Sequence, residues 1–179
     1  EPSSEHIFGT DRFGRDIFAR VLWGGRRLVS IAFAAVIFGL ILGIPVGILA
    51  GYYGGYVDAF AMRVVDGLLA FPGILLYLLL VTLAREWHLE GFFNDLILVF
   101  ALGFAFSPEA ARLSRGAVLT EKHKEYVEAS LNTGEANFYI AFRQIGPNCI
   151  SPLIVESTVR LGYAILIIAA LSFLGLGTP

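Results

Sequence analysis

A long run without charge dominates the first third of this chain. No charged residue lies between Arg27 and Asp58, and residues 28 to 51 are almost entirely apolar. A helix needs about 20 apolar residues to cross the hydrocarbon core of a bilayer. A backbone in lipid must satisfy its own hydrogen bonds, and the alternating pattern of a closed barrel does not occur here. The run therefore predicts a membrane-spanning helix over 28–51.

Further stretches of the same character predict an all-α, polytopic membrane protein with about four spans. After 28–51, the expected spans are 66–84, 92–115 and 149–175. Only 16% of the 179 residues are charged, whereas soluble domains carry about 25%. The whole chain, 1–179, is therefore expected to form a single transmembrane domain, preceded by an outer segment at 1–27.

Individual residues refine three of these spans. Phe71-Pro72-Gly73 interrupts the second span and predicts a bend. The third span meets charge near its end, so it is expected to continue beyond the membrane as a charged helical extension. Glu156 and Arg160 lie one turn apart in the fourth span and are expected to pair.

Small residues and prolines in the first two spans indicate close packing and bending. Four glycines recur at every fourth position and therefore share one helix face: Gly39, Gly43, Gly47 and Gly51. Small residues at this spacing let a second helix approach closely in lipid; the alternative is that they only reflect membrane composition. Pro45 is expected to kink the first span or loosen its hydrogen bonds, and Pro72 to act as a hinge in the second.

The polar stretch 120–148 predicts two short helices joined by a turn. The first helix is expected from Glu125 to Thr133, followed by a turn at Gly134, because glycine tolerates a positive φ. Asn137 is the expected N-cap of the second helix, and Pro147 is expected to end it. An exposed apolar stripe is expected on that helix, formed by Phe138, Phe142 and Ile145. Such a pair suits docking into a groove of another protein, or lying flat on lipid.

Sequence motifs of catalysis are absent. The sequence contains no Gly-x-x-x-x-Gly-Lys-Ser/Thr phosphate loop, no His-Glu-x-x-His and no Gly-x-Ser-x-Gly. The histidines at 6, 88 and 123 are far apart in sequence, so no metal site is expected. The net charge of −2 gives no argument for nucleic acid, and Cys149 is expected to be a packing residue.

Motifs along nearly the whole chain carry a resemblance to one family. They are His6-Ile7-Phe8-Gly9-Thr10-Asp11, Gly51-Tyr52-Tyr53-Gly54-Gly55, Leu69-Ala70-Phe71-Pro72, Glu125-Tyr126-Val127-Glu128-Ala129, Arg143-Gln144-Ile145-Gly146-Pro147-Asn148 and Leu171-Ser172-Phe173-Leu174-Gly175-Leu176-Gly177. This ordered set resembles the membrane (permease) subunits of bacterial ABC importers, in the dipeptide, oligopeptide and nickel branch. Ser130 stands where that family usually has alanine, and Gly146 where leucine is common.

The resemblance implies a function and a set of partners. In that family, 120–148 corresponds to a cytoplasmic coupling loop that docks on a separate ATPase. The coupling residues would be Glu128, Ala129, Ser130, Gly134, Phe138, Phe142, Ile145 and Pro147. The chain would translocate peptides or a similar small solute, with nickel as another candidate, across the bacterial cytoplasmic (inner) membrane.

Other components would supply the chemistry and the solute. The implied partners are a second permease subunit, two ATP-binding subunits that hold ATP and Mg, an extracytoplasmic solute-binding protein and membrane lipid. The chain itself would bind no cofactor and would not be an enzyme. Family members have six spans, so the first and last are expected to be missing here.

Several alternatives stay open on the sequence. The resemblance places Asp11, Arg15 and Asp16 on the outer side near the binding protein; the alternative is a loop held by local capping and salt bridges. A self-sufficient secondary transporter or channel would use Asp66, Glu156 and Arg160 as an ion path. Basic residues divide evenly between the two expected sides, so orientation rests on the resemblance.

Overall fold

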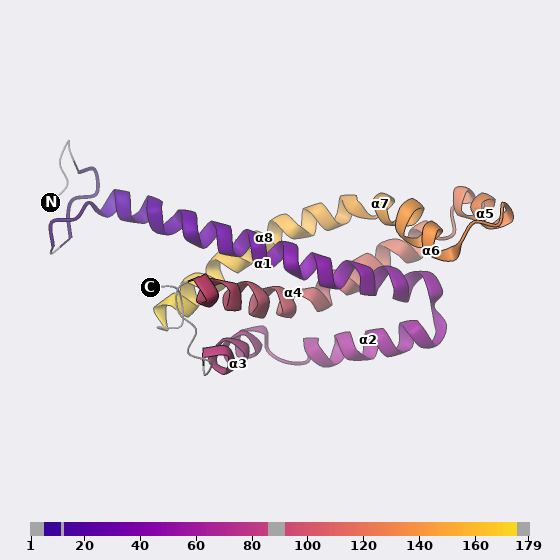
Figure 1. Cartoon of the computed structure of the whole chain (residues 1–179), viewed down its shortest axis with the longest axis horizontal. Helices are drawn as coiled ribbons and strands as arrows, with labels where there is room; N and C mark the ends of the chain where they lie inside the picture. Colours follow the sequence, from indigo (N-terminus) through magenta and orange to yellow (C-terminus); the bar gives the residue numbers. More distant parts are fainter. Residues whose placement is uncertain (1–5, 12, 86–91, 175–179) are drawn as a thin grey trace.

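The computed structural model describes residues 6–11, 13–85 and 92–174. Its regular elements are helices, which confirms the predicted all-α fold. The longest helices follow one long axis, with the start of α1 at one end and α5 and α6 at the other (Figure 1). Within the described residues, three helices are long and apolar enough to cross a membrane, or four if α2 and α3 form one broken span.

Helix α1, Ile17–Tyr53, is longer than the predicted first span. It begins at Ile17, where the Asp16 side chain accepts a hydrogen bond from the Phe18 N–H at 2.9 Å. The last part of the predicted outer segment 1–27 is therefore helical rather than a separate loop. The helix also continues through Pro45, because packing on its neighbours offsets the hydrogen bond that proline cannot donate.

Helix α4, Phe92–Glu121, packs against the glycine face of α1. A Cβ atom added at these glycines would lie 3.0 Å or less from a backbone oxygen of α4: Gly39 faces Gly103, Gly43 faces Ser107, Gly47 faces Ala111 and Gly51 faces Arg115. The contacts advance by four residues on both helices in the same direction, so α1 and α4 run parallel. Glycine allows this approach because a side chain would overlap the facing backbone.

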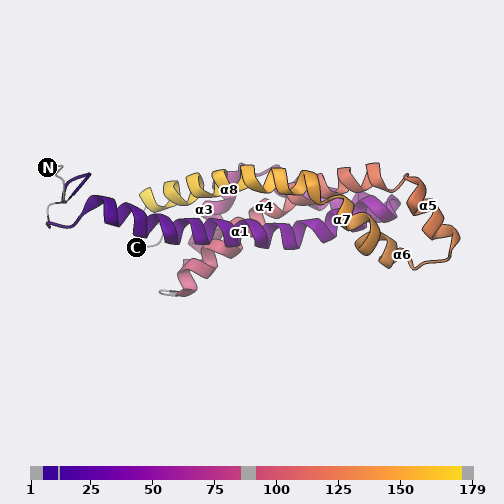
Figure 2. The same ribbon diagram turned by 90° about the horizontal axis from the view of Figure 1, so that it is seen from above.

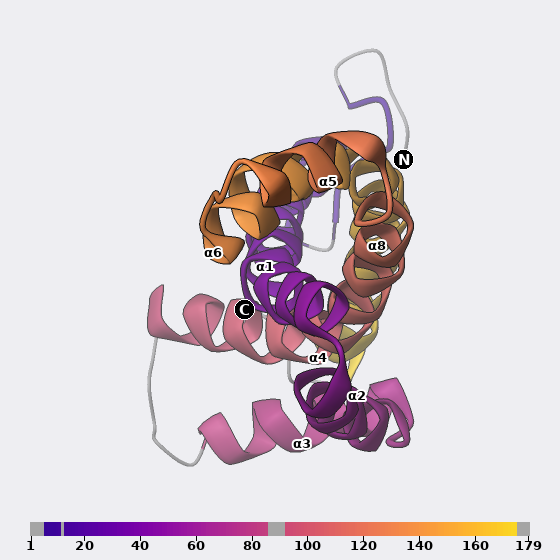
Figure 3. The same ribbon diagram turned by 90° about the vertical axis from the view of Figure 1, so that its right-hand side faces the viewer.

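The predicted second span, 66–84, was wrong in its bounds. Helix α2 is Gly55–Leu69 and helix α3 is Gly73–Arg85, and they meet at 86°. The chain turns back after α1 at two glycines with positive φ, Gly54 at 67° and Gly55 at 54°. Helix α2 therefore begins earlier than the charge pattern indicated. Asp66 consequently lies near the end of a helix, not the start. The chain bends at Pro72, and α3 lies across the bundle (Figure 3).

Helix α8, Ile150–Phe173, returns along the bundle to the end where α1 begins. The apolar core joins α1, α3, α4 and α8 through Ala35, Val81, Leu98, Leu102 and Ile168, among others. The predicted end of the fourth span at 175 and the Gly175-Leu176-Gly177 motif lie outside the described residues. So do residues 1–5 and 12 of the outer segment, and His88.

Candidate functional site

The segment between α4 and α8 projects from one end of the molecule (Figure 2). Its helices are α5, Glu125–Asn132, and α6, Asn137–Tyr139; then the π-helix η1, Ile140–Ile145, and α7, Gly146–Asn148. Gly134 turns the chain between α5 and α6 with φ at 77°, a conformation that favours glycine. The turn between α1 and α2 lies at the same end of the bundle (Figure 1).

A buried anchor cluster joins this segment to α1 and α4. It consists of Ile48, Val118, Val127, Ile140, Ala141, Ile145 and Cys149. Cys149 is 1% exposed, and burial raises the pKa of its thiol to about 11. The thiol is therefore protonated at neutral pH and packs as a small apolar group, as expected from the sequence.

Hydrogen bonds reinforce the anchor cluster. The Tyr52 hydroxyl on α1 donates to Asn137 Oδ1 at 3.0 Å. Asn137 was predicted to be the N-cap of this helix, but Ala136 occupies that position and Asn137 is the first residue of α6. The Asn137 side chain instead accepts the hydrogen bond from α1. Asn148 Nδ2 donates to the Tyr126 hydroxyl at 3.2 Å, which donates to Glu121 Oε2 at 3.1 Å. Both ends of the segment are therefore fixed to the bundle.

The predicted apolar stripe was wrong in part. Phe138 is 63% exposed and Ile145 is fully buried in the anchor cluster, with Phe142 packed against that cluster. Residues 140–145 form a π-helix, which has more residues per turn than an α-helix. The spacing i, i+4, i+7 therefore does not keep the three side chains on one face.

Pro147 does not end the helical path as predicted. It lies in the first turn of α7, and α8 begins at Ile150 after only Cys149. A proline is tolerated in a first turn because its missing N–H is not needed there. The π-helix η1 ends at Ile145, so Pro147 lies in the first turn of the α-helix that follows.

The outer part of the segment exposes three large apolar side chains beside smaller and charged residues. We call this set the tip surface: Glu128, Ala129, Leu131, Gly134, Phe138 and Tyr139. Ser130 is half-buried beside it. Sequence reasoning missed Leu131 and Tyr139, which are each 49% exposed. Leu131 follows the buried Val127 by four residues, so helical periodicity would have placed it inside. It is exposed because α5 ends at Asn132.

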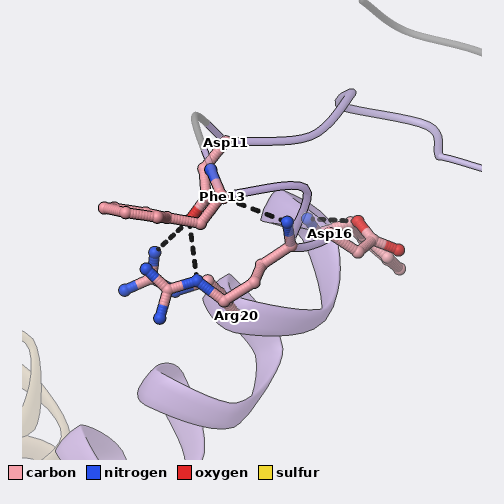
Figure 4. Close-up of polar contacts among 6 residues, drawn as sticks. Asp11, Phe13, Asp16 and Arg20 are labelled. Atoms are coloured by element: carbon pink, nitrogen blue, oxygen red, sulfur yellow. Dashed lines mark hydrogen bonds and ion pairs between the residues drawn. The ribbon is translucent and has the colours of Figure 1, made fainter.

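At the opposite end, Asp11 organises a tight turn before α1 (Figure 4). Its carboxylate accepts from the Phe13 N–H at 2.8 Å and the Arg15 N–H at 3.0 Å, and from Arg15 Nε at 3.0 Å and Arg20 Nη1 at 2.8 Å. The hydrogen bond from the Arg15 backbone is the largest cause that lowers the pKa of Asp11 to about 2. Asp16 instead caps α1 and faces His6, so local capping and ion pairs account for the described contacts of Asp11, Arg15 and Asp16.

Charged side chains within the bundle form several ion pairs, some of which involve Asp66, Glu156 and Arg160. The Glu156–Arg160 pair is confirmed at 2.8 Å, and Glu109 of α4 also pairs with Arg160. Asp66 instead pairs with Arg112. The ion path predicted for Asp66, Glu156 and Arg160 is therefore not formed by direct contact. Sequence reasoning missed Glu109 and Arg112, although charge on an otherwise apolar helix was an available signal.

Comparison with known proteins identifies the family. Residues 43–179 match the family described as binding-protein-dependent transport system inner membrane component. The chain is 42% identical over 176 residues to dipeptide transport system permease protein DppC of Alkalihalophilus pseudofirmus, covering 98% of this chain. It is 44% identical over 176 residues to glutathione transport system permease protein GsiD of Salmonella paratyphi A, again covering 98% of this chain.

The chain spans 56% of the length of each of these relatives. A solved structure with a similar fold is that of the MetNI methionine ABC transporter in inward-facing conformations. Its TM-score is 0.72 and its sequence identity 21%, over 88% of this chain and 76% of that chain. The family match covers most of the sequence, and the fold agrees with it. The chain belongs to the family of binding-protein-dependent transport system inner membrane components.

Proposed function

We propose that this chain is part of the permease subunit of an ATP-driven ABC importer, in the bacterial cytoplasmic membrane. An extracytoplasmic binding protein would deliver peptides or a similar small solute, with nickel as another candidate cargo. The names of the relatives support a peptide-like solute. A second permease subunit and two ATP-binding subunits would complete the assembly.

The observation that carries this proposal is the tip surface on its anchored base. Leu131, Phe138 and Tyr139 are exposed on a projection whose inner side is fixed to α1 and α4 by the anchor cluster. A rigid projection with exposed aromatic side chains suits a groove on a partner. We propose that this partner is the ATPase subunit, and that ATP and Mg bind there.

A mechanism follows from the contacts of the segment. Movement of the docked tip surface would pass through the anchor cluster to Ile48 of α1 and Val118 of α4. The two helices would move together, because their backbones pack closely along the glycine face. The turn at Gly54 and the bend at Pro72 are the places where α2 and α3 can change angle.

Co-purification of the full-length protein from membranes tests the proposal. Gly134→Leu strains the turn, because Gly134 has a positive φ, yet the added side chain meets no neighbour within 4 Å. We expect ATPase recovery and ATP-driven uptake to fall about tenfold, with unchanged amounts of permease in the membrane. Gly24→Leu is the matched control, since Gly24 is equally open and lies near the opposite end of α1.

Two results would count against the proposal. ATPase recovery and uptake could be the same for Gly134→Leu as for Gly24→Leu, in which case the turn has no part in docking. Alternatively, reconstituted vesicles without nucleotide could continue ion-coupled uptake, which would favour a secondary transporter.

A further inference from the structure

A hollow of about 450 Å³ opens between α4 and α8. Two carboxylates and two guanidinium groups line it, from Glu109, Glu156, Arg112 and Arg160. Leu113, Ala117 and Pro152 add apolar surface. Its volume is in the range of small-molecule sites. Charged groups of both signs therefore line this hollow.

The register of α1 and α4 places this hollow at membrane depth. Gly43 and Gly47 contact α4 at Ser107 and Ala111, so Glu109 and Arg112 lie at about the level of α1 residues 45–48. That level is inside the uncharged run of α1 between Arg27 and Asp58. Arg112 is nevertheless 57% exposed. Charged groups facing lipid are costly, so this side of the bundle faces water or a polar partner.

The hydrogen bonds in the hollow leave groups of both signs available. Glu156 accepts both of its hydrogen bonds from Arg160 through Oε1, and none of the described residues donates to its Oε2. The Arg112 guanidinium carries five N–H donors, and its described bond is the one that Nη2 donates to Asp66. One carboxylate oxygen can therefore accept a hydrogen bond from a ligand, and several guanidinium N–H groups can donate to it.

We propose that this hollow is a transit site for a zwitterionic solute, with Glu156 receiving its ammonium group and Arg112 its carboxylate. The inference rests on the proposed import function and adds the solute class and the residues that meet it. Arg160 is 18% exposed and lies between two carboxylates. It is a positioning residue that holds Glu109 and Glu156 at the wall.

The test uses the assembled importer with the full-length protein, reconstituted in vesicles with its binding protein. ATP-driven uptake is measured for trialanine, N-acetyl-trialanine and trialanine amide. For Glu156→Gln, we expect the preference for trialanine over N-acetyl-trialanine to fall about tenfold, as one hydrogen bond to a charged group is lost. For Arg112→Gln, we expect the preference for trialanine over trialanine amide to fall by a similar factor.

Each variant is the other's control, because both remove a charge from the same hollow but affect opposite ends of the solute. The same binding protein serves every sample, so its own preference cancels when each variant is compared with the wild type. Arg63→Gln removes an exposed charge of α2 outside the hollow and is expected to change neither preference.

Three outcomes would overturn the inference. Both variants could slow all three solutes equally, or they could separate the permease chains in detergent, which would make the hollow a subunit contact. The wild type could also take up none of the solutes, which would exclude the zwitterionic peptide class. Failure of the import function itself is distinct, because it appears as loss of ATPase co-purification in the wild type.

Discussion

Gly47 shows how closely two backbones approach at the centre of this molecule. A Cβ atom there would lie 1.9 Å from Ser114 Oγ and 2.2 Å from the Ala111 carbonyl oxygen. Ser114 is itself buried and donates to the Ala110 carbonyl oxygen at 2.8 Å, so it has little freedom to move. A close-packed interior cannot absorb such an overlap locally, so a side chain at Gly47 would push α1 and α4 apart.

Gly47→Ala should therefore destabilise the protein by about 1–3 kcal/mol, the usual range for overpacking. Gly24→Ala is the matched control on the same helix, because no atom lies within 4 Å of its added Cβ and alanine favours the helix. Thermal unfolding in detergent measures both. Equal unfolding temperatures for the two variants would mean that α1 and α4 are not in the contact described.

At the level of single elements, the π-helix η1 influences which side of the segment between α4 and α8 faces outward. It turns Ile145 into the anchor cluster and leaves Phe138 on the tip surface. The same chain segment can thus be held by one face and present another. A regular α-helix would have placed both side chains on one stripe.

Two substitutions separate these faces. Phe138→Ala should reduce co-purification of the ATPase while leaving the unfolding temperature unchanged, because Phe138 is 63% exposed. Ile145→Ala should lower stability by about 2–5 kcal/mol, as expected for a cavity in a packed core. Thermal unfolding and ATPase recovery are measured on the same preparations. The two-face description fails if Ile145→Ala unfolds no earlier than Phe138→Ala.

At the scale of the whole molecule, the parallel course of α1 and α4 sets the topology. The chain must return between them, which it does through α2 and the angled α3 (Figure 1). The turn between α1 and α2 therefore shares one end of the bundle with α5 and α6, and the Asp11 turn lies at the other end. If the end that carries α5 and α6 is cytoplasmic, the turn between α1 and α2 is also cytoplasmic and the Asp11 turn lies on the outer side of the membrane.

Cysteine labelling of membrane vesicles measures this arrangement. In a Cys149→Ser background, Thr133→Cys and Tyr56→Cys should react with an impermeant maleimide in inside-out vesicles. Phe13→Cys should react only in right-side-out vesicles. Tyr56 and Phe13 are 96% and 80% exposed, so access is not limited by burial. Labelling of Phe13→Cys and Thr133→Cys from the same side would contradict the topology.

Sequence patterns alone were sufficient to predict the helical membrane class, the family and the position of the polar segment between α4 and α8. Those conclusions depend on local patterns: an uncharged run long enough to cross a bilayer, a four-residue glycine repeat and an ordered set of motifs. The pairing of Glu156 with Arg160 was also predictable, because one helical turn brings them together. Each of these signals lies within a single stretch of chain.

The contacts between helices, by contrast, follow from the three-dimensional arrangement of the chain. The partner of the glycine face, the pairing of Asp66 with Arg112 and the burial of Ile145 depend on the relative positions of α1, α2 and α4. Local periodicity cannot supply these positions, because glycine turns, the angled α3 and one π-helix each change the direction of the chain. The charged hollow appears only when α4 and α8 lie together, since its four ionised side chains come from both helices.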